Sequence, residues 1–198
     1  MSRGFSPREI AQISLFTALA VLLNLLVSVP DPGAPFLFFE VWEIPIFVAL
    51  LVIGFKGAGV VAGLNTLVLE AVKPGSVPAG PLYNLIAVLS TFVGIMVVRR
   101  FAPGGLEGRR RLWVLGTLLG ASVRVLVMTV VNWIVLPLPF PLGFGSFGLT
   151  ASEVPPLLVP IGIFNFILAI YSVPTAFSLY AALRSRSRGS IATTGGAK

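Results

Sequence analysis

The chain has 198 residues, of which 56% are hydrophobic and 11% are charged, with a formal net charge of +7 and a mean hydropathy of +0.98. A water-soluble domain of this length would not tolerate so much apolar surface, and at about 20 residues per membrane crossing the chain holds roughly six crossings. The sequence contains no cysteine and no histidine, which excludes disulfides, thiol nucleophiles and the usual ligand sets of zinc, haem and iron–sulfur clusters. We therefore expect an all-α integral membrane protein, a bundle of six transmembrane helices.

The first half of the chain predicts three crossings, at about residues 10–29, 44–55 and 58–72. The first run is too long for the apolar region of a typical signal peptide, so we interpret it as a helix. The second has about 12 residues and would be near 18 Å long, less than a hydrocarbon core of about 30 Å, so neighbouring helices should shield it. A loop rich in proline, glycine and aromatic residues precedes it, and the segment GFKGAG predicts a tight turn after it.

The second half predicts crossings at about residues 82–98, 112–136 and 156–183. Two outer loops, KPGSVPAGP and PLPFPLGFGSFGLTAS, and one basic loop, FAPGGLEGRRR, join these helices. Residues 1–9 should form a short cytoplasmic segment, 10–183 the membrane domain, and 184–198 a polar cytoplasmic tail without regular structure.

Basic residues gather on one side of the predicted membrane domain, whereas Lys73 lies on the other side and Arg124 lies within a crossing. By the positive-inside rule, the basic side is cytoplasmic, which places both termini in the cytoplasm. Because these charges flank apolar runs and form no basic face on a soluble surface, we exclude nucleic acid as a partner. The residues on the basic side are Arg3, Arg8, Lys56, Arg99, Arg100, Arg109, Arg110, Arg111, Arg184, Arg186, Arg188 and Lys198.

Polar side chains are few in the predicted crossings, and each is a candidate for function because an unsatisfied polar group is costly in hydrocarbon. Asn132 and Asn165 belong to the outer halves of the fifth and sixth crossings, with Trp133, Phe164 and Phe166 beside them in sequence. Their amides suit the edge of a flat heteroaromatic ligand, or alternatively hydrogen bonding between helices. The other candidates are Asn24, Asn65, Glu70, Asn84 and Arg124.

Arg124 lies near the middle of the membrane, where it serves either a functional site or a structural bond to helix carbonyls.

Small residues also recur four positions apart, in the pairs Ser14 and Ala18, Gly59 and Gly63, and Gly116 and Gly120. Such pairs pack helices closely within one bundle, or dock a separate membrane subunit.

Three stretches together resemble the substrate-binding subunit, or S component, of energy-coupling-factor (ECF) vitamin transporters, and most closely its riboflavin-specific members. The first is Glu43-Ile44-Pro45 followed by LLVIGFKGAGVVAGLN, and the second is GPLYNLIAVLSTFVG, which contains Asn84. The third is the pair MTVVNWIVLPLP and PIGIFNFILAIY, which contain Asn132 and Asn165. The resemblance extends over about residues 10–183.

The resemblance implies a protein of the cell membrane that is not an enzyme and has no cofactor. It would capture a vitamin, riboflavin or a related flavin, on the extracellular side for ATP-driven uptake. Asn132 and Asn165 match the family's two pocket amides, and Leu168 stands where the family has a lysine, so a different vitamin or heteroaromatic compound is the alternative ligand. Asn84 and Glu43 are further substrate-binding candidates, from the motifs that match.

The resemblance also implies partners, a membrane coupling subunit and two ATPase subunits, with Ser14 and Ala18 as the docking residues on the first helix. The sequence has no GxxxxGK[ST] motif, so another chain must hydrolyse the ATP by that route.

Two other classes of protein remain as alternatives. One is a membrane-embedded lipid enzyme, which would need paired carboxylates, a histidine or an activated serine, and the other is an assembly protein without a ligand.

Overall fold

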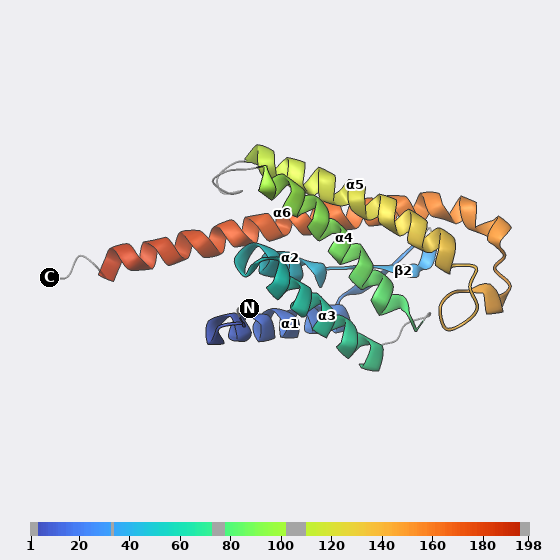
Figure 1. Ribbon diagram of the computed structural model, residues 1–198, viewed down its shortest axis with the longest axis horizontal. Coiled ribbons are helices and arrows are strands. Elements are labelled where there is room, and N and C mark those ends of the chain that lie inside the picture. Colours follow the sequence, from blue (N-terminus) through green and yellow to red (C-terminus); the bar gives the residue numbers. More distant parts are fainter. Residues whose placement is uncertain (1–3, 33, 73–77, 102–109, 195–198) are drawn as a thin grey trace.

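The computed structural model describes residues 4–32, 34–72, 78–101 and 110–194, with the side chains of all of these except 34–36 and 186–194. Four of the basic residues assigned above, Arg3, Lys73, Arg109 and Lys198, lie outside the described residues. Helices dominate, in the order α1 (Pro7–Leu26), α2 (Glu43–Val52), α3 (Gly54–Val72), α4 (Gly80–Arg100), α5 (Arg110–Val135) and α6 (Val154–Thr194) (Figure 1). The short elements are strands β1 (Ser28–Asp31) and β2 (Ala34–Glu40) and two turns of 3-10 helix, Gly145–Phe147 and Ala151–Glu153.

Five of the described helices, all but α2, are long and apolar enough to cross a membrane. Helix α2 has ten residues, which makes it about 15 Å long. Its side chains from Pro45 to Leu50 are all buried, because α1, α3 and α6 pack around it. The expected shielding of the short second helix is therefore confirmed, and the chain is a multi-pass membrane protein.

The turn between α2 and α3 is tight, because only Ile53 separates the two helices, but the segment GFKGAG, predicted to be the turn, forms the start of α3. Gly54 has a φ of 83°, in the left-handed region that glycine adopts without steric cost. This conformation reverses the chain, so that α3 packs back against α2.

Helix α5 lies between α4 and α6, and its glycines set the packing distance (Figure 1). A Cβ atom at Gly94 of α4 would lie 2.5 Å from the Cα of Gly120, and one at Gly116 would lie 3.6 Å from the Phe177 ring of α6. The pair Gly116 and Gly120 therefore serves packing within the bundle. At Gly59 and Gly63 a Cβ atom would meet nothing within 4 Å.

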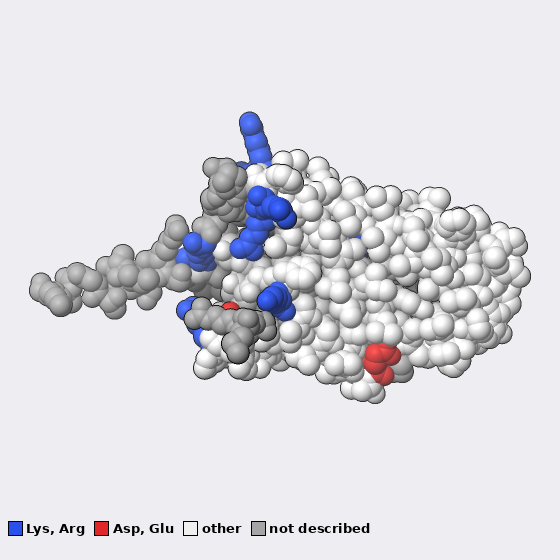
Figure 2. Space-filling model, viewed as in Figure 1, with Lys and Arg blue, Asp and Glu red and all other residues white. Residues whose placement is uncertain are grey.

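The outer surface of the bundle carries many exposed apolar side chains, and polar groups are buried among the apolar residues of its core. Leu15, Leu67 and Leu126 are each more than half exposed, whereas Arg124 is 1% exposed. Figure 2 shows the exposed basic side chains gathered at one end of the molecule, where α1 begins and α4 ends. The charge asymmetry predicted from the sequence is thus present among the described residues.

Two segments differ from the sequence-based expectations. The outer segment after α1, expected to be a loop in an all-α fold, forms an antiparallel hairpin in which Val29 pairs with Phe39 and Pro30 with Phe38. Its β-branched and aromatic side chains favour strands, and Asp-Pro-Gly at 31–33 is a turn sequence. The segment after Leu183, expected to lack regular structure, continues α6 as far as Thr194.

The close crossing of α4 and α5 predicts that Gly94→Ala destabilises the fold. A methyl group there meets backbone atoms of Gly120, which cannot rotate away, so the free energy of unfolding should fall by about 1–3 kcal/mol. Denaturation of the purified protein in detergent measures this loss. Gly59→Ala is the matched control, because its methyl group meets open space; equal losses in both variants would contradict the packing described.

Candidate functional site

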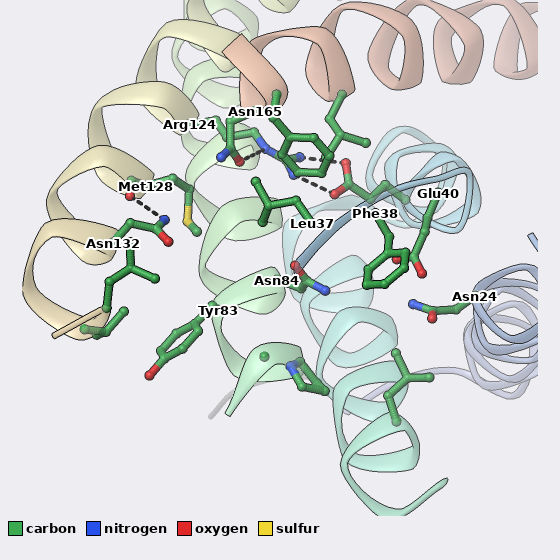
Figure 3. Close-up of a pocket in the computed structure, with 18 of the residues that line it drawn as sticks. Asn24, Leu37, Phe38, Glu40, Tyr83, Asn84, Arg124, Met128, Asn132 and Asn165 are labelled. Carbon is green, nitrogen blue, oxygen red and sulfur yellow. Dashed lines mark hydrogen bonds and ion pairs between the residues drawn. The ribbon is translucent and has the colours of Figure 1, made fainter. Parts of the chain in front are cut away.

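A cavity of about 170 Å³ lies between the ends of α1, α4, α5 and α6 that face away from the basic residues (Figure 3). Its wall includes Asn84 near the start of α4, whereas the basic Arg99 lies 15 residues further along the same helix, near its other end. The cavity brings together all five residues that the sequence nominates for substrate binding: Glu43, Asn84, Asn132, Asn165 and Leu168. Residues from seven elements, α1, β2, α2, α3, α4, α5 and α6, thus form one site.

Helix α5 contributes Arg124, Met128 and Asn132 to the cavity at intervals of four, and Val135 three residues later. Residues four apart lie one above the other on a helix face, so this spacing places the first three on the side from which Arg124 reaches Glu43 of α2 and Asn165 of α6. Helix α6 contributes Asn165 and Leu168 in the same way. The helical repeat therefore explains why these residues share the cavity.

An ion pair between Glu43 and Arg124 crosses the centre of the bundle, with the two side chains 2% and 1% exposed. Arg124 Nη1 donates to Glu43 Oε2 at 2.6 Å and Nη2 donates to Oε1 at 2.8 Å, the bidentate geometry that gives the strongest charge-assisted hydrogen bonds. Arg124 Nε donates to Asn165 Oδ1 at 2.9 Å (Figure 3). Glu43 is the first residue of α2, where the helix dipole also favours a negative charge.

Three of the four asparagines that line the cavity, Asn84, Asn132 and Asn165, differ in what they offer a ligand. Asn165 accepts from Arg124 and donates from Nδ2 to the carbonyl of Ile161, so both of its polar atoms have partners. Asn132 donates to the carbonyl of Met128, and its Oδ1 accepts no hydrogen bond from the described residues. The Asn84 amide lines the cavity with no hydrogen bond among the described residues. Of the two predicted pocket amides, Asn165 thus takes the structural role that the sequence left open.

The hairpin and the segment after it form the remaining wall of the cavity. Trp42 donates from Nε1 to Glu40 Oε2 at 2.7 Å, and the Tyr171 hydroxyl of α6 donates to the backbone carbonyl of Glu40 at 2.6 Å. On the opposite wall, the Tyr83 hydroxyl donates to the carbonyl of Leu142 at 2.6 Å. These bonds fix the outer segments to the helices that they cover.

Most aromatic residues of the cavity are not the sequence neighbours of Asn132 and Asn165. Phe164 lines the cavity, but Trp133 and Phe166 are 59% and 44% exposed, because residues adjacent in a helix point in different directions. Aromatic side chains from the outer segments and the start of α4 take their place: Phe38, Trp42, Tyr83 and Phe144. Two acidic residues, Glu40 and Glu43, also line the cavity.

The two residues nominated for subunit docking lie away from the cavity. Ser14 and Ala18 are exposed on α1, whereas Ile13, Phe16 and Ala20 on the opposite face of that helix are buried in the core. The position of Ser14 and Ala18 leaves them open to a partner; their role stays a prediction.

No protein-family model matches the chain, and no curated protein matches it. One solved structure, described as the S component of a bacterial ECF transporter, is similar over 90% of this chain and 96% of that chain, with a TM-score of 0.72 and 21% sequence identity. The chain therefore has the fold of an ECF S component.

Because Glu43 and Arg124 neutralise each other in the bundle, removing either charge leaves the other buried and unpaired. We expect Glu43→Gln and Arg124→Met each to lower the free energy of unfolding by about 3–5 kcal/mol, and the double variant to lose much less than the sum. Chemical denaturation in detergent measures all three. If the losses in the two single variants add up in the double variant, the two side chains do not stabilise each other. Arg99→Met, which removes a charge at an exposed position, is the control.

Proposed function

We propose that this chain is the substrate-capture subunit of an ECF-type transporter, which binds riboflavin or a related flavin from outside the cell. The observation that carries the proposal is the cavity itself, in which Asn84, Asn132 and Asn165 meet aromatic side chains within an S-component fold. Amides beside aromatic rings suit a flat heterocycle, since the rings stack on its plane while the amides bond to its edge. The role is binding and handover, without catalysis.

The direction of capture follows from charge. Exposed arginines and a lysine gather at the end of the bundle opposite the cavity, and the positive-inside rule assigns that end to the cytoplasm. The cavity then faces the outside of the cell membrane, and both chain termini face the cytoplasm. A ligand would therefore be taken up from the outer face.

The energy for uptake would come from other chains, a membrane coupling subunit with two ATPase subunits. Ser14 and Ala18 would meet the coupling subunit, because small side chains let two helices approach closely and their face of α1 is open. Asn24, near the end of the same helix, lines the cavity, so α1 connects the proposed docking face to the ligand site.

Binding of riboflavin by the purified protein, followed by isothermal titration, tests the proposed ligand. Asn132→Ala and Asn84→Ala should each weaken binding by about 5- to 150-fold, since loss of one hydrogen bond to a buried ligand costs about 1–3 kcal/mol. Leu168→Lys, which restores the family's lysine, should keep or raise affinity. Asn165→Ala is a less direct test, because it also removes a partner of Arg124.

Asn65→Ala is the matched control for these amides, since Asn65 is a buried amide of α3 outside the cavity lining. It should leave riboflavin affinity unchanged. A wild-type protein that binds a different heteroaromatic vitamin and no flavin would contradict the flavin assignment and leave the capture role intact. A protein that binds no small molecule would contradict both.

Docking through α1 predicts that Ser14→Leu and Ala18→Leu reduce association with the coupling subunit while ligand affinity stays within about twofold. Co-purification with the coupling and ATPase subunits, in parallel with titration of the isolated chain, separates the two properties. Ser122→Leu makes the same change at an exposed small residue of α5 and should leave association intact. Equal loss of ligand binding and association would indicate a folding defect and count against this docking face.

A further inference from the structure

An open groove of about 610 Å³ lies between the start of α3 and the end of α4, at the basic end of the bundle. Helix α4 has 21 residues and is therefore about 31 Å long, which matches a hydrocarbon core of about 30 Å. The two arginines in its last turn thus reach the level of the lipid headgroups when α4 crosses the membrane. The residues that line the groove are Phe55, Val93, Met96, Val97, Arg99 and Arg100.

The α4 side of the groove is one face of that helix. Val93, Met96, Val97 and Arg100 follow one another at intervals of three, one and three residues, so they lie on the same side of the helix. Val93 and Val97 are 49% and 41% exposed, whereas Phe92, on the core side of the same helix, is fully buried. The face is an apolar stripe about 10 Å long that ends at a cation.

The α3 side of the groove is the ring of Phe55, which the core holds in place. The ring meets Phe92 edge to face, with ring centroids 6.0 Å apart and planes at 71°. Such contacts between aromatic rings are favourable beyond the area that they bury. The exposed ring of Phe55 and the stripe on α4 therefore form two walls of a groove with a fixed position.

The charge of the groove indicates the kind of molecule that would fill it. Arg99 and Arg100 are both exposed, so their guanidinium groups are accessible, and the donors of a guanidinium match the oxygens of a phosphate. Anionic phospholipids attract basic side chains at the membrane surface, and basic pockets between transmembrane helices bind their headgroups. An apolar stripe below the arginines suits an acyl chain of the same molecule. A free phosphate would leave that stripe unused.

We propose that this groove binds an anionic phospholipid. The headgroup phosphate lies on Arg99 and Arg100, and an acyl chain follows Val93, Met96 and Val97 beside Phe55. Zwitterionic phosphatidylcholine binds less well, because its headgroup carries a cation next to the phosphate. The lipid site is at the other end of the bundle from the cavity and does not depend on which ligand the cavity captures.

The test compares two lipids that differ only in their headgroup. The protein is purified in detergent, stripped of lipid and titrated with phosphatidylglycerol or phosphatidylcholine of identical acyl chains, and native mass spectrometry measures the bound lipid. We expect phosphatidylglycerol to bind at least about tenfold more tightly, since a basic residue near the membrane surface contributes about fivefold. Glycerophosphoglycerol, the same headgroup without acyl chains, should bind at least about tenfold more weakly than the lipid, because it leaves the apolar stripe empty.

Two double variants separate the groove from the general charge of this end of the bundle. Arg99→Gln with Arg100→Gln should reduce the preference for phosphatidylglycerol to less than about threefold. Its binding of phosphatidylcholine should not change, which would show that the fold and the apolar stripe are intact. Arg110→Gln with Arg111→Gln is the matched control, because it removes the same charge from two adjacent exposed arginines of α5 outside the groove lining. This variant should keep the preference.

Equal binding of the two lipids by the wild-type protein overturns the inference. It is also overturned if both double variants lose the preference equally, or if neither does, since the groove is then not the source of the selectivity. Binding of glycerophosphoglycerol as tight as that of the lipid would make the groove a phosphate site only. If the wild type shows no lipid preference and the Arg99 and Arg100 variant fails to co-purify with the coupling and ATPase subunits, the groove is a subunit interface instead.

Discussion

The ion pair between Glu43 and Arg124 is the interaction on which the rest of the structure depends. It joins the first residue of α2 to the middle of α5, and Asn165 extends it to α6, so three helices meet at one polar network. A membrane interior offers no water to solvate either charge, which makes the two side chains obligatory partners. Helix α2 is too short to cross the membrane alone. The polar network and the burial of the apolar side chains of α2 hold this helix in place.

The cavity follows from the same constraint. Glu43 marks both the start of α2 and a point on the cavity wall, so the chain before it, from Leu37 to Trp42, lies over the end of that helix and lines the space. Helices α4, α5 and α6 extend past this level, and the first two supply Asn84 and Asn132 there. A short central helix surrounded by longer ones thus leaves room for a ligand on one side, and the hairpin covers part of that room.

The sequence predicts the helices well, because apolar runs of about 20 residues and their basic flanks are strong signals. It also nominates five residues that line the cavity: Asn84, Asn132 and Asn165 as polar groups in apolar runs, and Glu43 and Leu168 through the resemblance to S components. It does not predict that Arg124 pairs with Glu43, 81 positions away, because single-sequence patterns carry no information on distant contacts. The sequence analysis misses the hairpin for another reason. Asp-Pro-Gly at 31–33 is a typical turn sequence, but a short run of aromatic residues after a membrane helix is equally compatible with a loop.

We propose that the cavity opens to the outside of the cell and holds the captured ligand. The chain has no cysteine, so Leu142→Cys at the cavity wall and Arg111→Cys at the basic end give a clean comparison by membrane-impermeant thiol labelling of intact cells. We expect the cysteine at position 142 to react from outside and to be protected by riboflavin, and the one at position 111 to stay unlabelled until the cells are opened. Labelling of position 111 from outside, or equal labelling of position 142 with and without riboflavin, would contradict it.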